Sequence, residues 1–201
     1  MDQASSSESS QDPGSVLRGL GVFRTADAER HGVSQPTVSR LAANGTLVRL
    51  GWGIYHHRDA DVDVATVDYA VATLRFGPDA VIGGLTALFH YVLIEQVPQQ
   101  VWVMVPQSVR GRVPPLFRLL RTKHDPKVAV VDHGSYRLAT AERAVVEAFC
   151  YATKIGLATA VAAGRTALRE GKATEKSLWE IAEALGRQNV LRQHWEALTI
   201  R

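Results

Sequence analysis

The sequence has little of what marks secreted, membrane-spanning or metal-clustered proteins. Its 201 residues include one cysteine and two methionines, and aromatic residues make up 7% of the chain. The single thiol, Cys150, excludes an internal disulfide and a cysteine-based zinc site, which fits a reducing compartment. The longest apolar runs are as short as VWVMV at 101–105, far below the roughly 18 residues of a membrane span. The first residues lack the pattern of a secretory signal, so we expect a cytoplasmic protein without a membrane partner.

Charge is spread unevenly along the chain, although the net charge is only +3. Residues 1–13 are rich in serine and carry three acidic side chains and no basic one, and we expect them to form a disordered tail. Residues 14–60 carry six arginines against three acidic residues, and residues 110–127 carry six basic side chains against Asp125 alone. Such local basic concentrations are typical of proteins that meet a polyanion, although ordinary solvated surfaces look similar.

Residues 14–60 have the outline of a winged helix-turn-helix domain. The expected elements are a helix that begins at an N-cap Thr25, a turn at Gly32–Ser34, a helix over 35–43, and a hairpin of 46–50 and 53–55 that turns at Gly51–Trp52. Val38, Leu41 and Ala42 share one side of the second helix at i, i+3 and i+4. The opposite side of that helix is therefore expected to face solvent.

The second helix of such a motif enters the major groove of DNA, where its N-terminal side chains read base edges. Suitable donors and acceptors stand at Gln35, Thr37, Ser39 and Arg40. The hairpin is expected to lie on the backbone or in the minor groove, and it offers Arg49 and Trp52. Two alternatives stay open: the second helix has a structural role only, and Trp52 is a core residue beneath the hairpin.

Residues 61–201 predict a second domain, which makes the chain α+β: a mixed sheet-and-helix domain that ends in several helices follows the winged helix. Asp61 or Asp63 caps its first helix, and the run at 101–105 indicates a buried strand. Further expected elements are strands at 80–82, 116–120 and 128–131, a helix over 85–93, and three or four helices after Thr140 that break near Gly156, Gly171 and Gly186.

Four segments follow one another in a characteristic order. They read FRTADAERHGVSQPTVSRLAANGTLVRLGWGIYHHRD, IGGLTALFHYVL, VPQQVWVMVP and RLATAERAVVEAF. With them the chain resembles the AbiEi family of bacterial antitoxins over roughly residues 20 to 150, most specifically in the wing GTLVRLGWGIY and the LTAL and TAER helices. It departs from the family at Phe89–Tyr91, where relatives often read Leu-His-Gly.

The resemblance implies an antitoxin encoded beside a nucleotidyltransferase-type toxin, which its C-terminal domain opposes. It also implies that the protein represses its own operon by binding double-stranded operator repeats, with Gln35, Thr37, Ser39, Arg40 and Arg49 on the DNA. The family suggests no catalytic residue, so we expect no enzymatic activity and no cofactor. Because one winged helix covers a short half-site, we expect a monomer in solution and two copies on repeated half-sites.

The basic segment 110–127 has three interpretations. Its cationic side chains could contact phosphates, or they could face an acidic surface of the toxin. Alternatively, they belong to an edge strand that their charges protect from pairing with other chains. The side chains in question are Arg110, Arg112, Arg118, Arg121 and Lys123.

Two other functions stay open, a metal-dependent nuclease and a repressor whose second domain senses a small molecule. Pro78-Asp79 with Glu170-Gly171-Lys172 spells a nuclease motif, but the second part stands at an apparent helix end. Asp61 and Asp63 resemble the carboxylates of a two-metal nucleotidyltransferase, yet helix capping explains both. The seven histidines show no HxxxH or HExxH spacing, so we expect no metal site.

Overall fold

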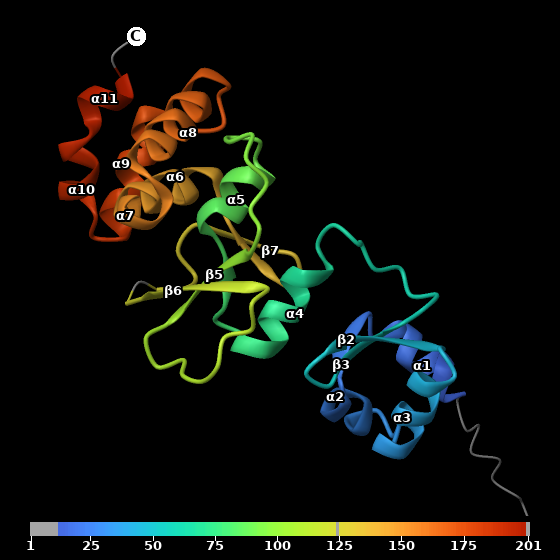
Figure 1. The fold of residues 1–201 in the computed structure, drawn as a ribbon. Coiled ribbons are helices and arrows are strands. Elements are labelled where there is room, and N and C mark those ends of the chain that lie inside the picture. Colours follow the sequence, from blue (N-terminus) through green and yellow to red (C-terminus); the bar gives the residue numbers. More distant parts are fainter. Residues whose placement is uncertain (1–11, 124, 200–201) are drawn as a thin grey trace, which may run out of the picture. The chain divides into compact units, whose positions relative to one another are not determined.

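The computed structural model describes residues 12–123 and 125–199, and its elements fall into two units, Met1–Val67 and Asp68–Arg201 (Figure 1). Most of the tail expected over residues 1–13 lies outside the described residues. The last two of these residues are described, and there Asp12 caps a helix that begins at Pro13. The Asp12 carboxylate accepts a hydrogen bond from the backbone N–H of Ser15 at 3.0 Å.

The first unit is a winged helix-turn-helix, as predicted. Its helices are α1 (Pro13–Gly19), α2 (Thr25–Arg30) and α3 (Gln35–Ala43), and its strands are β1 (Val22–Arg24), β2 (Leu47–Gly51) and β3 (Ile54–His57). The strands form an antiparallel sheet in the order β1-β3-β2. The helices and the sheet enclose a core in which Leu17, Phe23 and Val38 are at most 1% exposed. The Phe23 and Tyr55 rings stack within it, with centroids 6.3 Å apart.

The start of α2 differs from the prediction by one residue. The N-cap is Arg24 and not Thr25, because the Asp27 side chain at N3 accepts a hydrogen bond from the Arg24 backbone N–H, which is the N3 half of a capping box. The Asp27 carboxylate accepts hydrogen bonds from the Arg24 backbone N–H at 2.8 Å and from Arg24 Nε at 3.2 Å, and it also pairs with Arg30. One carboxylate therefore holds both ends of the short first helix of the motif.

The hairpin also turns one residue later than predicted. The two residues between its strands are Trp52 and Gly53, with φ of 52° and 71°. Positive φ at both central positions matches the type I′ turn, whose twist suits a two-residue hairpin. Glycine adopts a positive φ without steric strain, whereas a residue with a side chain, such as Trp52, is destabilised in this conformation.

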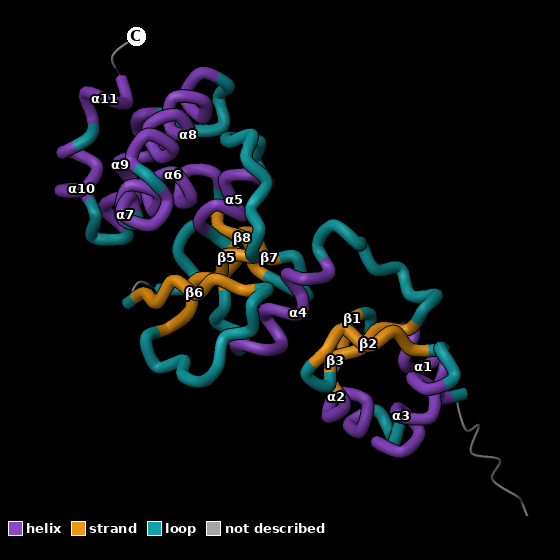
Figure 2. The backbone as a smooth tube through the Cα atoms, viewed as in Figure 1, coloured by secondary structure: helices purple, strands orange, loops and turns teal. Residues whose placement is uncertain are grey.

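The second unit holds a five-stranded mixed sheet in the order β6-β5-β4-β8-β7 (Figure 2). Its strands are β4 (Val81–Ile82), β5 (Val101–Pro106), β6 (Phe117–Thr122), β7 (Val130–Asp132) and β8 (Arg137–Ala139). Pairs β5–β6 and β4–β8 are parallel, and pairs β4–β5 and β7–β8 are antiparallel. The sequence analysis did not predict β8, which pairs with both β4 and β7.

Helices cover both faces of this sheet, which confirms the α+β class. They are α4 (Val67–Phe76), α5 (Gly84–His90), α6 (Ala141–Cys150), α7 (Ala152–Ile155), α8 (Leu157–Arg169), α9 (Glu175–Ala184), α10 (Gln188–Gln193) and α11 (Trp195–Thr199). Helix α4 meets one face, where the rings of Phe76 and Phe117 lie 5.2 Å apart. Helix α5 packs on the other face, so closely that a Cβ at Gly84 would lie 2.7 Å from the Trp102 ring. No helix among the described residues is long and apolar enough to cross a bilayer.

Candidate nucleic-acid interface

Helix α3 turns one face into the core and leaves the other to solvent. Val38 is 1% and Leu41 8% exposed, because both pack against the remainder of the first unit. Gln35, Ser39 and Arg40 are exposed on the outer face. The periodicity of the sequence therefore predicted the orientation of this helix correctly.

Thr37 is the exception among the four residues predicted on α3, since it is only half exposed. Its Oγ1 lies 3.1 Å from Oγ of Ser34, the N-cap residue. This contact joins the two hydroxyls across the first turn, and the Ser34 side chain makes no capping hydrogen bond with the backbone there. The first N–H groups of an α-helix have no intrahelical acceptor and can donate to an anion such as a phosphate.

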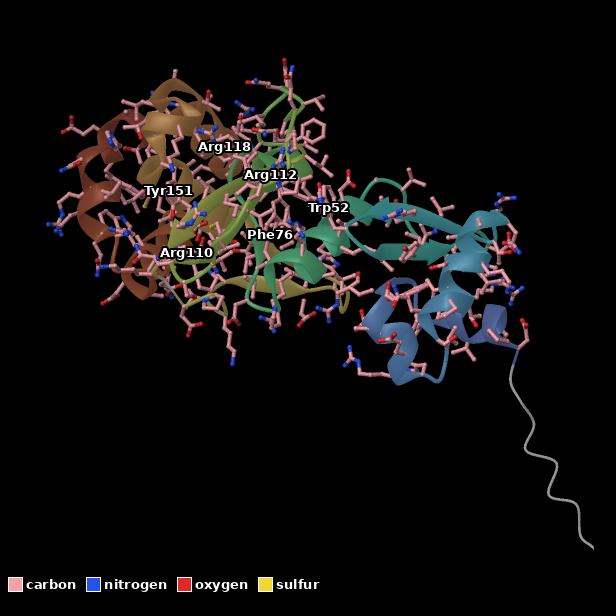
Figure 3. The ribbon with its side chains drawn as sticks, turned by 60° about the horizontal axis from the view of Figure 1, so that its bottom comes forward. Trp52, Phe76, Arg110, Arg112, Arg118 and Tyr151 are labelled. Atoms are coloured by element: carbon pink, nitrogen blue, oxygen red, sulfur yellow. The ribbon has the colours of Figure 1, made fainter. Side chains whose placement is uncertain are left out.

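The hairpin places Arg49 on β2 and Trp52 at the turn (Figure 3). Arg49 is exposed, and 44% of the Trp52 surface is exposed, outside the core cluster of the unit. A half-exposed aromatic at a hairpin tip offers a flat apolar surface, and the neighbouring arginine adds a positive charge.

The cations of the first unit differ in how they are engaged. Arg24 and Arg30 both pair with Asp27, which neutralises part of their charge. The guanidinium groups of Arg40 and Arg49 make no hydrogen bond or ion pair with any residue in the described part of the chain. These two guanidinium groups are thus available to phosphates or to guanine, which accept bidentate hydrogen bonds from arginine.

A hollow of about 440 Å³ lies beside Arg40, and it was not foreseen. Arg18 of α1, Thr46 and His57 also border it. Arg18 did not stand out in the sequence, because its helix could not be separated there from the following strand. The hollow thus brings a second cation next to Arg40, together with the carboxylate of Asp12.

The basic segment of the second unit does not form a single cationic face. Arg118 lies over the Trp102 ring at 5.6 Å, whereas Arg121 Nε donates to the carbonyl of Val109 at 3.2 Å. Side chains three residues apart leave opposite faces of a strand, so the two arginines of β6 point apart. Arg110 and Arg112 precede β6 in the loop after β5, and Arg110 donates to the Gln107 carbonyl (Figure 3). Lys123 follows the last residue of β6, which is an edge strand of the sheet.

The residues weighed as catalytic or metal-binding are engaged in local contacts. Asp63 accepts hydrogen bonds from the Ala65 backbone at 2.9 Å and the Thr66 hydroxyl at 3.0 Å. Glu170 Oε2 lies 2.7 Å from Lys172 Nζ at the end of α8, and Asp79 pairs with Arg137 at 4.0 Å. Across residues 12–123 and 125–199, no group of three or more His, Cys, Asp or Glu side chains could hold a metal ion.

Comparisons with known proteins bear on both units. The sequence model of the family described as "Transcriptional regulator, AbiEi antitoxin" matches residues 15–55. Among solved structures, the chain is similar to the crystal structure of the RV2827C protein from Mycobacterium tuberculosis, with 12% sequence identity and a TM-score of 0.60. This similarity covers 94% of the present chain and 80% of the other chain, and at such an identity it concerns the fold alone. A search of the curated proteins finds no match.

The residues that match the family model include the exposed residues of the candidate DNA-binding surface. Residues 15–55 run from α1 into β3, and they contain the exposed face of α3 and the hairpin turn. This stretch is therefore similar to the regulators of the AbiEi antitoxin family, and the resemblance predicted from the sequence is confirmed over residues 15–55.

Proposed function

We propose that the protein is a cytoplasmic repressor that silences its own operon through the winged helix and acts as the antitoxin of a toxin–antitoxin pair. The observation that carries the proposal is the outer face of α3, where Gln35, Ser39 and Arg40 are exposed within the segment that matches the AbiEi regulators. As partner we propose a nucleotidyltransferase-type toxin, on the strength of the family resemblance. We also propose that the protein itself catalyses no reaction.

The DNA contacts follow from the chemistry of the exposed residues. With α3 in the major groove, Gln35 pairs with adenine, and Arg40 pairs with guanine or a phosphate. Each bidentate base contact contributes about 1–3 kcal/mol of discrimination. Arg49 and Trp52 of the hairpin lie on the neighbouring backbone, where arginine adds affinity with little sequence preference.

A gel-shift series with the DNA upstream of the operon tests this assignment. Arg40→Ala and Arg49→Ala are each expected to weaken binding about tenfold, since a lost contact of about 1.4 kcal/mol is a factor of ten. Lys176→Ala is the matched control, because this cation is 86% exposed on α9 of the second unit and is not expected on the DNA. Unchanged binding by both arginine variants would discard the proposed face.

The salt dependence of DNA affinity separates the backbone contact proposed for Arg49 from the base contact proposed for Arg40. Each phosphate contact contributes about −0.9 to the slope of log K against log salt concentration. Arg49→Ala is therefore expected to flatten this slope by about one, with equal loss on operator and unrelated DNA. Arg40→Ala should instead reduce the preference for the operator. If Arg40→Ala flattens the slope and Arg49→Ala reduces the preference for the operator, the hairpin reads the bases and the helix contacts the backbone.

The antitoxin role is tested by co-expression with the nucleotidyltransferase encoded beside it. We expect the full-length chain to restore growth that the toxin arrests. A nuclease is tested by incubating the protein with plasmid and Mg²⁺ or Mn²⁺, where cleavage that disappears in Glu170→Ala would favour the enzyme. A gene neighbourhood without any nucleotidyltransferase would favour a small-molecule sensor instead.

A further inference from the structure

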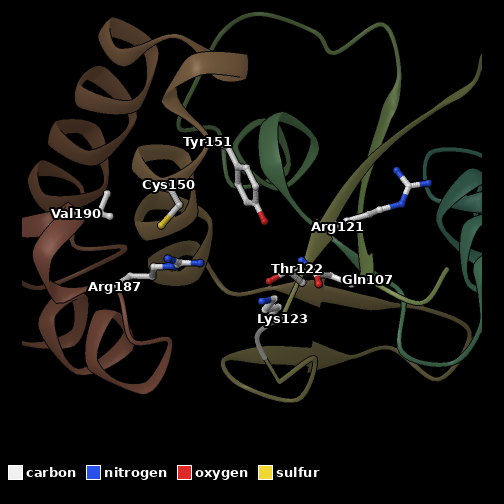
Figure 4. Close-up of a pocket in the computed structure, with 8 residues that line it drawn as sticks. All are labelled: Gln107, Arg121, Thr122, Lys123, Cys150, Tyr151, Arg187 and Val190. Carbon is white, nitrogen blue, oxygen red and sulfur yellow. The ribbon is translucent and has the colours of Figure 1, made fainter. Parts of the chain in front are cut away.

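The second unit contains a pocket of about 470 Å³ between the end of β6, the end of α6 and the start of α10 (Figure 4). Thr122 and Lys123 border it from the strand side, Tyr151 borders it from α6, and Arg187 and Val190 border it from α10. Three segments that are distant in the sequence thus meet at one hollow. Its volume falls in the range of about 300–1,000 Å³ that is usual for small-molecule sites.

The lining of this pocket is positively charged. Among the described residues that border it are the cations of Arg121, Lys123 and Arg187, and none of these described residues is an aspartate or glutamate. The two other titratable groups that face it are neutral at neutral pH, since burial raises the pKa of the Cys150 thiol to about 11 and also raises the pKa of the Tyr151 hydroxyl. An anion entering the pocket therefore meets attraction without an opposing carboxylate.

A nearby carboxylate does not cancel this charge. Glu147 lies one turn before Tyr151 on α6 and attracts Arg187, but it already pairs with Arg143 at 3.2 Å. These three side chains, two guanidinium groups and one carboxylate, together carry a formal net positive charge. Of the three, Arg187 lines the pocket.

Hydroxyl groups complete the arrangement. Tyr151 forms a hydrogen bond with Thr122, whose surface is only 7% exposed. In Figure 4 the Tyr151 hydroxyl and the Arg187 guanidinium point toward the space beside Thr122. The Arg121 guanidinium points away from that space. Phosphate oxygens in proteins commonly accept hydrogen bonds from such cationic side chains and hydroxyl groups.

We propose that this pocket binds a phosphate-bearing small molecule of about the size of a mononucleotide. Arg187 and Lys123 hold the phosphate, and the Thr122 hydroxyl donates to it. The apolar part of the ligand packs against the Tyr151 ring and Val190. A small ion reaches the recessed Thr122, whereas the backbone of a stiff duplex does not.

Calorimetric titration of the full-length protein in a phosphate-free buffer tests the proposal. The probes are adenosine 5′-monophosphate, inorganic phosphate and uncharged adenosine. We expect saturable binding of the monophosphate at one site per chain, weaker binding of inorganic phosphate and none of adenosine. Arg187→Gln and Lys123→Gln should each weaken the monophosphate at least tenfold. Arg192→Gln, an exposed position on the same helix α10, should leave its Kd unchanged.

The same measurements can also contradict the proposed phosphate site. Absence of saturable binding by both phosphate probes would overturn the proposal, and so would equal weakening in Arg192→Gln. Loss of duplex binding in gel shifts, without any phosphate binding, would assign these cations to a nucleic-acid surface. Circular dichroism melting checks that each variant folds. If Arg187→Gln does not fold, the binding measured with Lys123→Gln decides the test. Lys123 is exposed and lies beyond the end of β6, so we expect this variant to fold.

Discussion

Among single residues, Arg143 and Glu147 stand out because they place two charges inside the second unit, with side chains 0% and 1% exposed. Arg143 also donates to the carbonyls of Pro126 and Val128, and it thereby ties the chain before β7 to α6. Arg143 Nη2 and Glu147 Oε2 have no hydrogen-bond partner among the described residues. Burying ions costs several kcal/mol each, so this pair secures the position of a loop more than it adds stability.

The pair gives the fold a pH dependence. Burial raises the pKa of Glu147 above its usual 4.5, although the neighbouring arginines partly oppose this. The folded state then binds the proton more tightly than the unfolded state, so this contribution to stability is complete below pH 4.5 and lost as the pH rises through the folded pKa. The free energy of unfolding of the wild type, relative to Glu147→Gln, should fall from pH 4.5 toward neutrality in urea titrations. A rise over this range would mean that Arg143 lowers the pKa instead.

Trp52 allows the fold and the proposed DNA contact to be separated. Its positive φ costs roughly 1–2 kcal/mol for a residue with a side chain, and glycine avoids this cost but loses more entropy on folding. We therefore expect Trp52→Gly to change the free energy of unfolding by less than about 1 kcal/mol while weakening DNA binding severalfold. Thermal melts and gel shifts measure the two effects. A large loss of stability with unchanged affinity would make Trp52 a structural residue.

Among the elements, α2 depends on one capping carboxylate. Burial raises the pKa of Asp27, but hydrogen bonds from the Arg24 side chain and backbone, and from Arg30, lower it by more. Because the folded pKa lies below 3.8, the stabilisation is present above that pH and is lost as the pH falls through the folded pKa. Asp27→Ala should cost about 1 kcal/mol at pH 7, and this difference should shrink as the pH falls below 3.8 and through the folded pKa.

The exposed Glu29 on the same helix provides the control for this prediction. Glu29→Ala removes an acidic side chain that makes no capping contact, so its effect on the free energy of unfolding should stay within about 0.5 kcal/mol. Equal losses in the two variants would show that helix charge, and not the capping box, matters at Asp27.

The elements also show how far the sequence predicted the fold. Helix α3 and the hairpin were predictable, because both have clear apolar periodicity and punctuation by glycine. Strands β1 (VFR) and β8 (RLA) have three residues each and only two consecutive apolar residues, whereas the similarly short β4 and β7 lie in the predicted apolar runs AVI and VAVV. Strand β8 joins the sheet through β7 nearby and through β4, whose Ile82 pairs with Leu138 more than 50 residues later. Pairings at such a separation leave no local pattern.

The two candidate sites differ in the same way. The outer face of α3 was predictable, because helical spacing alone separates Gln35 and Arg40 from Val38 and Leu41. The phosphate pocket was not, because Lys123, Tyr151 and Arg187 converge only through the tertiary fold. Lys123 did stand out in the sequence, but only as one of several positive charges.

For the whole molecule, stoichiometry is the sharpest prediction. One winged helix reads a short half-site, so two chains should occupy an operator with two repeats. Sedimentation should give a single 21.9 kDa chain without DNA and two chains on a duplex with both repeats. A duplex with one repeat removed should take up one chain. A stable dimer in the absence of DNA would contradict independent binding.

The order of the strands has a consequence for synthesis on the ribosome. Every element of the winged helix lies within the first 57 residues, so the DNA-reading unit can form while most of the chain is still being translated. The five-stranded sheet cannot close until β8 emerges, because β8 joins β4 to β7. A nascent polypeptide would thus gain the means to recognise an operator well before it completes the part that we expect to restrain the toxin.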